Sequence, residues 1–100
     1  MIRSKKIRDS ARNESCTMES PACNGNPETV VWCHSNFSMH GKGTGIKAHD
    51  VFGFYGCAGC HDYYDGRTNT RDAAAVKRDL FFAAHSKSLL RLIEKGILKL

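Results

Sequence analysis

The sequence predicts a single small α+β domain, in which two short strands precede a helix and a second, long helix ends the chain. A chain of 100 residues is long enough for one modest core and too short for two. Two runs rich in β-branched and aromatic residues, at 29–34 and 51–55, are typical of strands. Apolar residues then recur with a helical period over residues 70–95.

The first 13 residues are predicted to form a basic arm ahead of a domain at residues 14–100, with a short helix around residues 6–13. The net charge of +5 favours a polyanionic partner such as a nucleic acid. A solvated, partly disordered tail would explain the same residues equally well. The basic residues of the arm are Arg3, Lys5, Lys6, Arg8 and Arg12.

The chain shows no signal peptide and no run of 18 apolar residues. We therefore expect a cytoplasmic protein without a membrane segment. Thiols stay reduced in that compartment, so cysteine pairs indicate metal or redox chemistry in preference to disulfides. The odd total of five cysteines also argues against full disulfide pairing, and Cys33 is the unpaired one.

The first strand lies between two loops. A dense turn signal, Asn-Gly-Asn-Pro at 24–27, precedes it, and it is predicted to end at His34. Residues 35–49 have no clear period and are expected to form a mobile loop. Its glycine run at 41–45 lacks the spacing of a phosphate-binding loop and has no helical pattern after it.

A short helix is predicted after the second strand, beginning near Gly59 or Cys60 and ending at Gly66, so that a ββα core spans about 29–67. The long helix follows at about 70–95. Thr70 is expected to cap it and Asp72 to lie in its first turn.

Four cysteines fall in two pairs, Cys16-x6-Cys23 and Cys57-x2-Cys60, which suits one tetrahedral zinc site. Zinc binding of roughly 10–16 kcal/mol can rival the whole folding free energy of so small a domain. Buried free thiols are the plain alternative. The segment Cys-Ala-Gly-Cys-His at 57–61 also matches the pattern of c-type haem attachment, but that function needs export and the chain shows no signal peptide. A thioredoxin-like redox role needs a βαβ pattern around the motif, which the sequence does not show.

His61 and Asp65 follow the second cysteine pair at a spacing of one helical turn, which places both on one helix face. Such a pair suits a hard divalent cation, although it is commonly a surface hydrogen bond. His34, at the end of the first strand, adds a third group. A histidine on a strand, a second strand and a ligand-bearing helix together make a ββα-metal arrangement.

With these motifs the sequence resembles the HNH (His-Me finger) endonucleases. It is similar in particular to the small nuclease-like proteins of lambdoid prophages, relatives of the nuclease domain of the phage recombination enhancement function protein. The resemblance covers most of residues 5–67, and the segment Cys-Asn-Gly-Asn-Pro-Glu-Thr at 23–29 is its most specific part. The matching positions are 6–12, 14–17, 22–29, Cys33, His34, Asp50 and 57–66.

The resemblance implies that His34 is the general base and that His61 and Asp65 bind a catalytic Mg²⁺ or Mn²⁺. It also implies that the four cysteines hold structural Zn²⁺. Three positions depart from the pattern. Cys33 stands where an acidic residue commonly precedes the base, Asp50 is the candidate for the oxygen ligand that the middle Asn supplies, and Asp65 replaces the final histidine.

The implied activity is metal-dependent hydrolysis of phosphodiester bonds in single- or double-stranded DNA by a prophage-derived endonuclease. A recombinase filament is an implied partner. A non-catalytic, zinc-stabilised DNA-binding or adaptor protein is the alternative from another class. The residues expected to contact the nucleic-acid backbone are Arg3, Lys5, Lys6, Arg8, Arg12, Lys42, Lys47 and Arg67.

Overall fold

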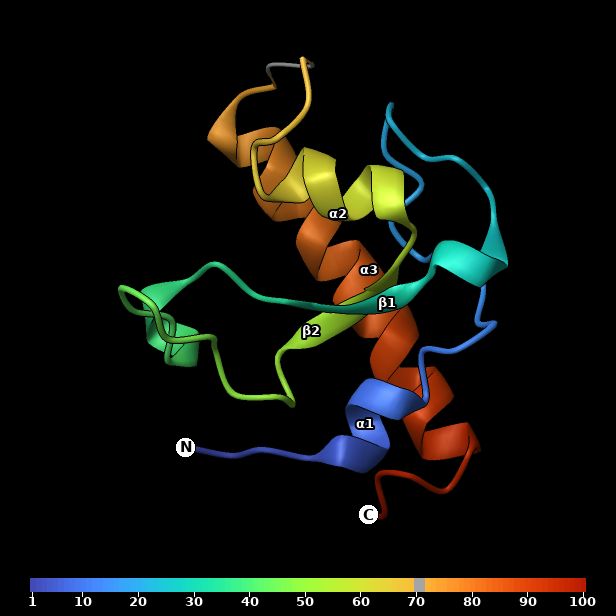
Figure 1. Cartoon of the computed structure of the whole chain (residues 1–100). Helices are drawn as coiled ribbons and strands as arrows, with labels where there is room; N and C mark the ends of the chain where they lie inside the picture. The colour runs from blue at the N-terminus through green and yellow to red at the C-terminus, as the bar shows by residue number, and fades with distance from the viewer. Residues whose placement is uncertain (70–71) are drawn as a thin grey trace.

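A computed structural model describes residues 1–69 and 72–100 and shows a β-hairpin, two short helices and a long C-terminal helix (Figure 1). This confirms the predicted α+β class. None of the described helices has the length and apolar character needed to cross a membrane. The elements are α1 (Lys5–Asp9), β1 (Val31–His34), β2 (Gly53–Gly56), α2 (Ala58–Tyr64) and α3 (Ala74–Glu94).

The two strands form an antiparallel hairpin in which His34 pairs with Gly53. Gly53 is required there, because a Cβ atom would lie 2.6 Å from the Cys33 carbonyl and from the Trp32 ring nitrogen. Both strands are shorter than the runs that predict them. A 3-10 turn at Pro27–Thr29, capped by the side chain of Asn26, takes the start of the first run.

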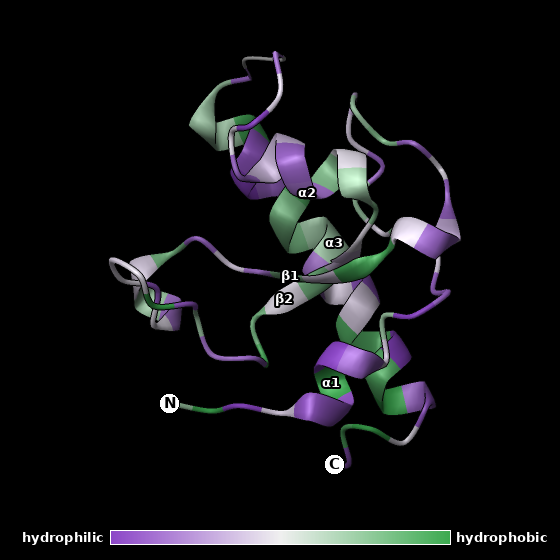
Figure 2. Ribbon diagram, viewed as in Figure 1, coloured by the Kyte–Doolittle hydropathy of each residue, from purple (hydrophilic) through white to green (hydrophobic). Residues whose placement is uncertain are grey.

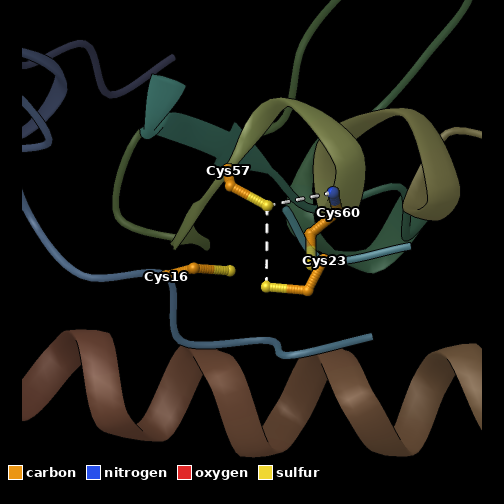
Figure 3. Close-up of side chains that lie close together, drawn as sticks. All are labelled: Cys16, Cys23, Cys57 and Cys60. Atoms are coloured by element: carbon orange, nitrogen blue, oxygen red, sulfur yellow. Dashed lines mark hydrogen bonds between the residues drawn. The ribbon is translucent and has the colours of Figure 1, made fainter. Parts of the chain in front are cut away.

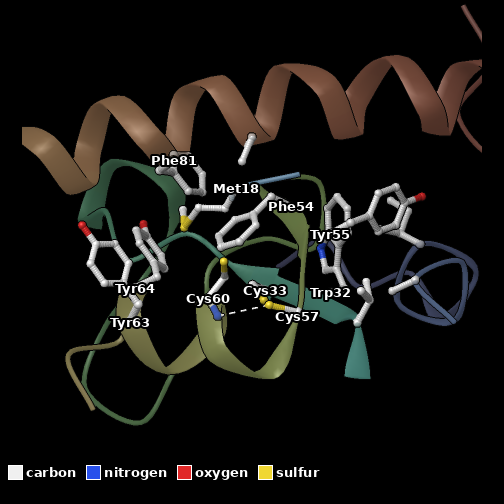
Figure 4. Packing of buried hydrophobic residues seen from close by; sticks show 14 of the residues in the cluster. Met18, Trp32, Cys33, Phe54, Tyr55, Cys57, Cys60, Tyr63, Tyr64 and Phe81 are labelled. Carbon is white, nitrogen blue, oxygen red and sulfur yellow. Dashed lines mark hydrogen bonds between the residues drawn. The ribbon is translucent and has the colours of Figure 1, made fainter. Parts of the chain in front are cut away.

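The core lies where the hairpin packs against α2 and α3. The ring of Phe81 on α3 lies with its centroid 5.8 Å from that of Phe54 and 5.4 Å from that of Tyr64 (Figure 4). Ser88 is a buried polar residue on the same face of α3, and its hydroxyl accepts a hydrogen bond from the Tyr55 amide at 3.0 Å. The buried face of α3 therefore also supplies a hydrogen-bond acceptor to β2, and along its length α3 carries both hydrophobic and hydrophilic residues (Figure 2).

The start of the long helix differs from the prediction. The helix begins at Ala74 with Ala73 as its cap residue, so Asp72 lies before the first turn. Its carboxylate instead accepts a hydrogen bond from the Tyr63 hydroxyl of α2. Val76, one of the apolar residues near the start of this helix, is 45% exposed. The predicted cap, Thr70, falls outside the described residues.

The N-terminal segment packs onto the same core as the rest of the chain. Helix α1 is capped by the Ser4 hydroxyl, and it buries Ile7, with Ala11 buried just beyond its end. The Ser10 hydroxyl lies 2.8 Å from the hydroxyl of Tyr55 on β2. Three of the basic residues of this segment, Lys5, Lys6 and Arg8, are therefore carried on a packed helix next to the hairpin (Figure 1).

The segment expected to be a mobile loop, between β1 and β2, is held at several points. At its base the Ser35 amide donates to the Phe52 carbonyl at 2.9 Å. The ring of His40 is buried and stacks on Phe52 with centroids 4.1 Å apart. The chain start runs beside this segment, where the Ile2 amide donates to the ring of His49 at 2.9 Å.

Candidate functional site

The four paired cysteines form one cluster, with all four sulfur atoms within 4.8 Å of one another (Figure 3). The sulfur atoms of Cys23 and Cys57 are 3.7 Å apart. A tetrahedron with Zn–S bonds of about 2.3 Å has sulfur atoms about 3.8 Å apart. The residues therefore fit a structural zinc ion, as predicted, and no described cysteine of the cluster is disulfide-bonded.

Backbone amides around this cluster point at its sulfur atoms. The Ser20 amide donates to Cys60 and the Asn24 amide to Cys57, each at 3.4 Å. The Cys60 thiol donates to Cys16, which lowers the pKa of Cys16, and nearby backbone amides act in the same direction. Such donors stabilise thiolates, the form of cysteine that binds metal.

The cysteine cluster also fixes the start of α2. The side chain of Cys57 caps this helix by accepting from the Cys60 amide. Gly59 lies so close to the loop of the first pair that a Cβ atom there would be 2.0 Å from the Ala22 carbonyl oxygen. Because His61 follows directly, its position depends on this contact.

His34, His61 and Asp65 line one cavity of about 110 Å³. Strand β1 supplies the first residue, and α2 and its C-terminal cap supply the other two. His61 Nε2 lies 3.2 Å from Asp65 Oδ2, the geometry predicted from their spacing. The structure thus brings together three of the four predicted catalytic residues. The remaining residues that line this cavity are Trp32, Ser35, Asn36, Lys42 and Lys47.

Asp65 is held as a carboxylate by polar neighbours. Burial acts to raise its pKa, but hydrogen bonds from His61 and Asn36 and the charge of Arg67 outweigh burial and lower the pKa to about 2. The Asn36 amide group donates to Oδ1 at 2.9 Å. Sequence reasoning missed Asn36, since a single Asn in an aperiodic loop carries no local signal.

Asp50 lies with His34 and away from the other predicted ligands. Its Oδ1 is 2.7 Å from His34 Nε2, and the Asp50 side chain is 1% exposed. It lines a second cavity and not the one that contains His61 and Asp65. Among the described residues, the cysteine cluster is the one gathering of three or more potential metal ligands. The structure therefore gives His61 and Asp65 no third protein ligand of these types.

The carboxylate of Asp50 also binds the N-terminal segment. Arg8 and the Ser4 amide donate to Oδ2, each at 2.6 Å, and Arg3 donates to Oδ1 at 3.2 Å. Burial acts to raise the pKa of Asp50, but the hydrogen bonds from His34, Ser4 and Arg8 lower it to about 2. Burial also lowers the pKa of His34, against the hydrogen bond to Asp50, which acts to raise it.

Cys33 points away from this site. It precedes His34 on β1 and is fully buried in the core, as the alternation of strand side chains requires. Burial, as the largest cause, strongly raises the pKa of its thiol, which is therefore neutral at pH 7. The acidic partner of His34 is supplied by Asp50, 16 residues later in the chain.

The predicted nucleic-acid-binding residues divide into three groups. Lys42 and Lys47 line the cavity that contains His61 and Asp65. Arg3, Arg8 and again Lys47 line the second cavity, of about 440 Å³. Arg67 pairs with Asp62 and Asp65 beside α2. The remaining ones line neither cavity: Lys5, which pairs with Asp9, and the exposed Lys6 and Arg12.

Comparison with known proteins places this arrangement in a family. The sequence profile described as "Putative nuclease YbcO" matches residues 5–95. The protein of that name from Escherichia coli (strain K12) is 33% identical over 94 residues, which cover 93% of this chain and 96% of that protein. The protein of the same name from Enterobacteria phage 82 matches to the same extent.

A solved structure shares the fold. It is described as a putative bacteriophage protein from Escherichia coli str. K-12 substr. MG1655, and it superposes with a TM-score of 0.71 at 27% sequence identity. The superposition covers 91% of this chain and 100% of that chain.

Proposed function

The chain belongs to the phage-associated YbcO family of putative nucleases, and from that membership and its site we propose that it is a metal-dependent endonuclease of the HNH (His-Me finger) type acting on DNA. One observation carries the proposal. His34 from the hairpin and His61 and Asp65 from α2 line one cavity together with two lysines, a set of groups suited to phosphodiester hydrolysis.

His34 is the proposed general base. The carboxylate of Asp50 can only accept a hydrogen bond, so Nε2 of His34 carries the proton and Nδ1 keeps its lone pair. Among the described residues, Nδ1 has no hydrogen-bond partner. The lowered pKa of His34 keeps the ring neutral at pH 7. Nδ1 is therefore the atom that would take a proton from the attacking water.

His61 and Asp65 are the proposed ligands of a catalytic Mg²⁺ or Mn²⁺. The low pKa of Asp65 keeps its carboxylate ionised, and the Asn36 hydrogen bond orients it. When bound, such an ion stabilises the negative charge on the phosphate and on the leaving oxygen. Two protein ligands leave positions for water and substrate oxygens, which is typical of Mg²⁺ sites.

The lysines at the cavity are proposed to hold the phosphate backbone. The side chains of Lys42 and Lys47 are exposed and form no ion pair with a described residue. Cations of this kind bind phosphates without reading base sequence, so we expect weak sequence preference and strong salt dependence. The cysteine cluster, with structural zinc, keeps α2 in place beside them.

Cleavage of plasmid and single-stranded DNA with Mg²⁺ or Mn²⁺ tests the proposal. We expect the wild-type protein to cleave DNA and the His34→Ala and Asp65→Asn variants to be inactive. Asp62→Asn is the matched control, because Asp62 lies on the same helix but outside the cavity and is 51% exposed. Equal activity in wild type and His34→Ala would contradict the assignment of the base. A wild type inactive with either metal would favour the non-catalytic DNA-binding alternative.

A further inference from the structure

The larger cavity, of about 440 Å³, lies beside the candidate active site and shares His34 and Lys47 with it. We propose that this cavity is a nucleotide subsite, which holds the nucleotide next to the phosphate that is cleaved. The inference rests on the proposed nuclease function, because it assigns the smaller cavity to the scissile phosphate. The residues that line the subsite are Arg3, Arg8, His34, Gly45, Ile46, Lys47 and Asp50.

The volumes of the two cavities indicate ligands of different size. Pockets that enclose small organic ligands measure about 300–1,000 Å³. At about 440 Å³ the larger cavity lies within that range, and at about 110 Å³ the smaller one lies below it. The smaller cavity therefore suits a phosphate group, and the larger one has room for a sugar and a base.

The charge of the larger cavity favours an anion. Arg3, Arg8 and Lys47 supply three cations, against the single carboxylate of Asp50. The carboxylate is covered, with 1% of its side chain exposed, whereas the side chains of Arg3 and Arg8 are 39% and 42% exposed. Asp50 thus binds two arginine side chains, and these side chains are the part of the cluster that is open to solvent. Guanidinium groups are well suited to phosphate oxygens.

Lys47 connects the two cavities. Its side chain lines both, and it forms no ion pair with a described residue. Its backbone is fixed, because the Lys47 carbonyl accepts a hydrogen bond from Arg3 at 2.8 Å. A phosphate backbone that passes from one cavity to the other would therefore pass this ammonium group.

Ile46 supplies an apolar surface to the same cavity. It is 50% exposed. It is the last residue of a tight turn, in which Gly43 and Ile46 exchange two backbone hydrogen bonds of 3.0 Å. An exposed isoleucine among cations offers contact to the face of a base or to a sugar. Because its side chain forms no hydrogen bonds, it cannot distinguish one base from another, and we expect the subsite to accept any base.

NMR titration of the full-length, zinc-loaded protein with thymidine 3′,5′-bisphosphate, without added Mg²⁺ or Mn²⁺, tests the subsite. We expect the amide signals of Arg3 and of residues 45–47 to shift. Lys47→Ala should weaken binding of the bisphosphate and of inorganic phosphate about tenfold, the loss of one charge-assisted contact. Ile46→Ala should weaken binding of the bisphosphate and leave that of inorganic phosphate unchanged.

The matched control is Lys87→Ala, which removes the same charge from an exposed position on α3 that lines neither cavity. It should bind the bisphosphate as the wild type does. Absence of shifts at residues 45–47, or affinity unchanged in both cavity variants, would overturn the subsite.

Cleavage assays separate this inference from the nuclease proposal. Bisphosphate binding that depends on Lys47 and Ile46, in a protein that cleaves no DNA, would support the subsite and contradict the nuclease. Cleavage that depends on His34 but shows an unchanged KM in Ile46→Ala, a residue that lines only the larger cavity, would support the nuclease and overturn the subsite.

Discussion

The Nε2 atom of His34 lies 2.7 Å from Oδ1 of Asp50, a carboxylate that also binds Arg3, Ser4 and Arg8. The proposed general base is therefore oriented by a residue that the N-terminal segment holds in place. Segments more than 40 residues apart in the sequence meet at this one carboxylate.

Asp50→Asn should lower kcat for DNA cleavage by about 10–100-fold, the usual cost of losing a group that orients a functional histidine. The neutral amide no longer fixes the proton on Nε2 of His34 or balances the two arginines. Cleavage rates at saturating substrate measure the effect, with circular dichroism to confirm folding. Asp9→Asn, which changes a surface carboxylate paired with Lys5, should cleave at the wild-type rate. An unchanged kcat in Asp50→Asn would show that His34 does not need this partner.

The pH dependence of cleavage should report His34. Burial lowers the pKa of His34 from its usual value of 6.5, so the neutral, active form persists below pH 6.5 and is lost only on further acidification. The acid limb of kcat, measured at saturating Mg²⁺, should therefore lie below pH 6.5. The Asp50 hydrogen bond acts to raise this pKa, so the limb of Asp50→Asn should move to still lower pH. A limb that moves upward in this variant would contradict the assignment.

Zinc removal should unfold much of the domain. We expect one zinc ion per chain by elemental analysis, bound by the four clustered cysteines. Zinc binding of roughly 10–16 kcal/mol is comparable to the whole stability of a small domain. A zinc chelator, added under reducing conditions that keep the cysteines as thiols, should therefore abolish the cooperative thermal transition. Added Zn²⁺ should restore it. A reduced protein that is stable and free of zinc would contradict the metal site.

Gly59→Ala should weaken zinc binding, although it replaces none of the four cysteines. The added methyl group would lie 2.0 Å from the Ala22 carbonyl, so α2 and the Cys23 loop must move apart. Zinc content and the midpoint of thermal unfolding measure the loss. Gly43→Ala is the matched control, since the nearest neighbour of its added Cβ is Ile46 at 3.9 Å. Equal zinc content and stability in the two variants would refute the close contact.

Arg3→Ala should loosen residues 47–50 without unfolding the core. The Arg3 guanidinium donates to the carbonyls of Lys47 and Ala48 and to Asp50, and the variant loses all three bonds. Amide hydrogen exchange should become faster in this segment, and cleavage should slow. Arg78→Ala, at an exposed position on α3 that lines neither cavity, should leave exchange and cleavage unchanged. Exchange in Arg3→Ala that matches the wild type would show that other contacts hold the segment.

The sequence predicts the parts of the site that depend on local spacing. The cysteine pair at Cys57 and Cys60, and the His61–Asp65 pair on one turn of helix, follow from residue order alone. The strand that ends at His34 is equally visible, because β-branched and aromatic residues precede it. All of these positions are found as expected in the hairpin and in α2.

Contacts between distant segments could not be predicted in this way. No local pattern shows that Asp50 meets Arg3 and Arg8, or that Asn36 donates to Asp65 across 29 residues. The charge of the N-terminal segment suggests a solvated arm, whereas the burial of Ile7 depends on a core built from later residues. Tertiary packing decides these positions.

The segment that connects β1 to β2 has two parts: a base fixed by contacts with other residues, and a tip whose turn forms its own hydrogen bonds. Ser35 bonds Phe52 at the base, Asp50 holds His34 there, and the turn from Gly43 to Ile46 completes its own hydrogen bonds. Residues could therefore be inserted or exchanged within that turn while His34 and Asp50 keep their positions. We expect the sequence of this turn to differ in relatives that bind a different nucleic acid. The same turn is a suitable position for engineering a new specificity.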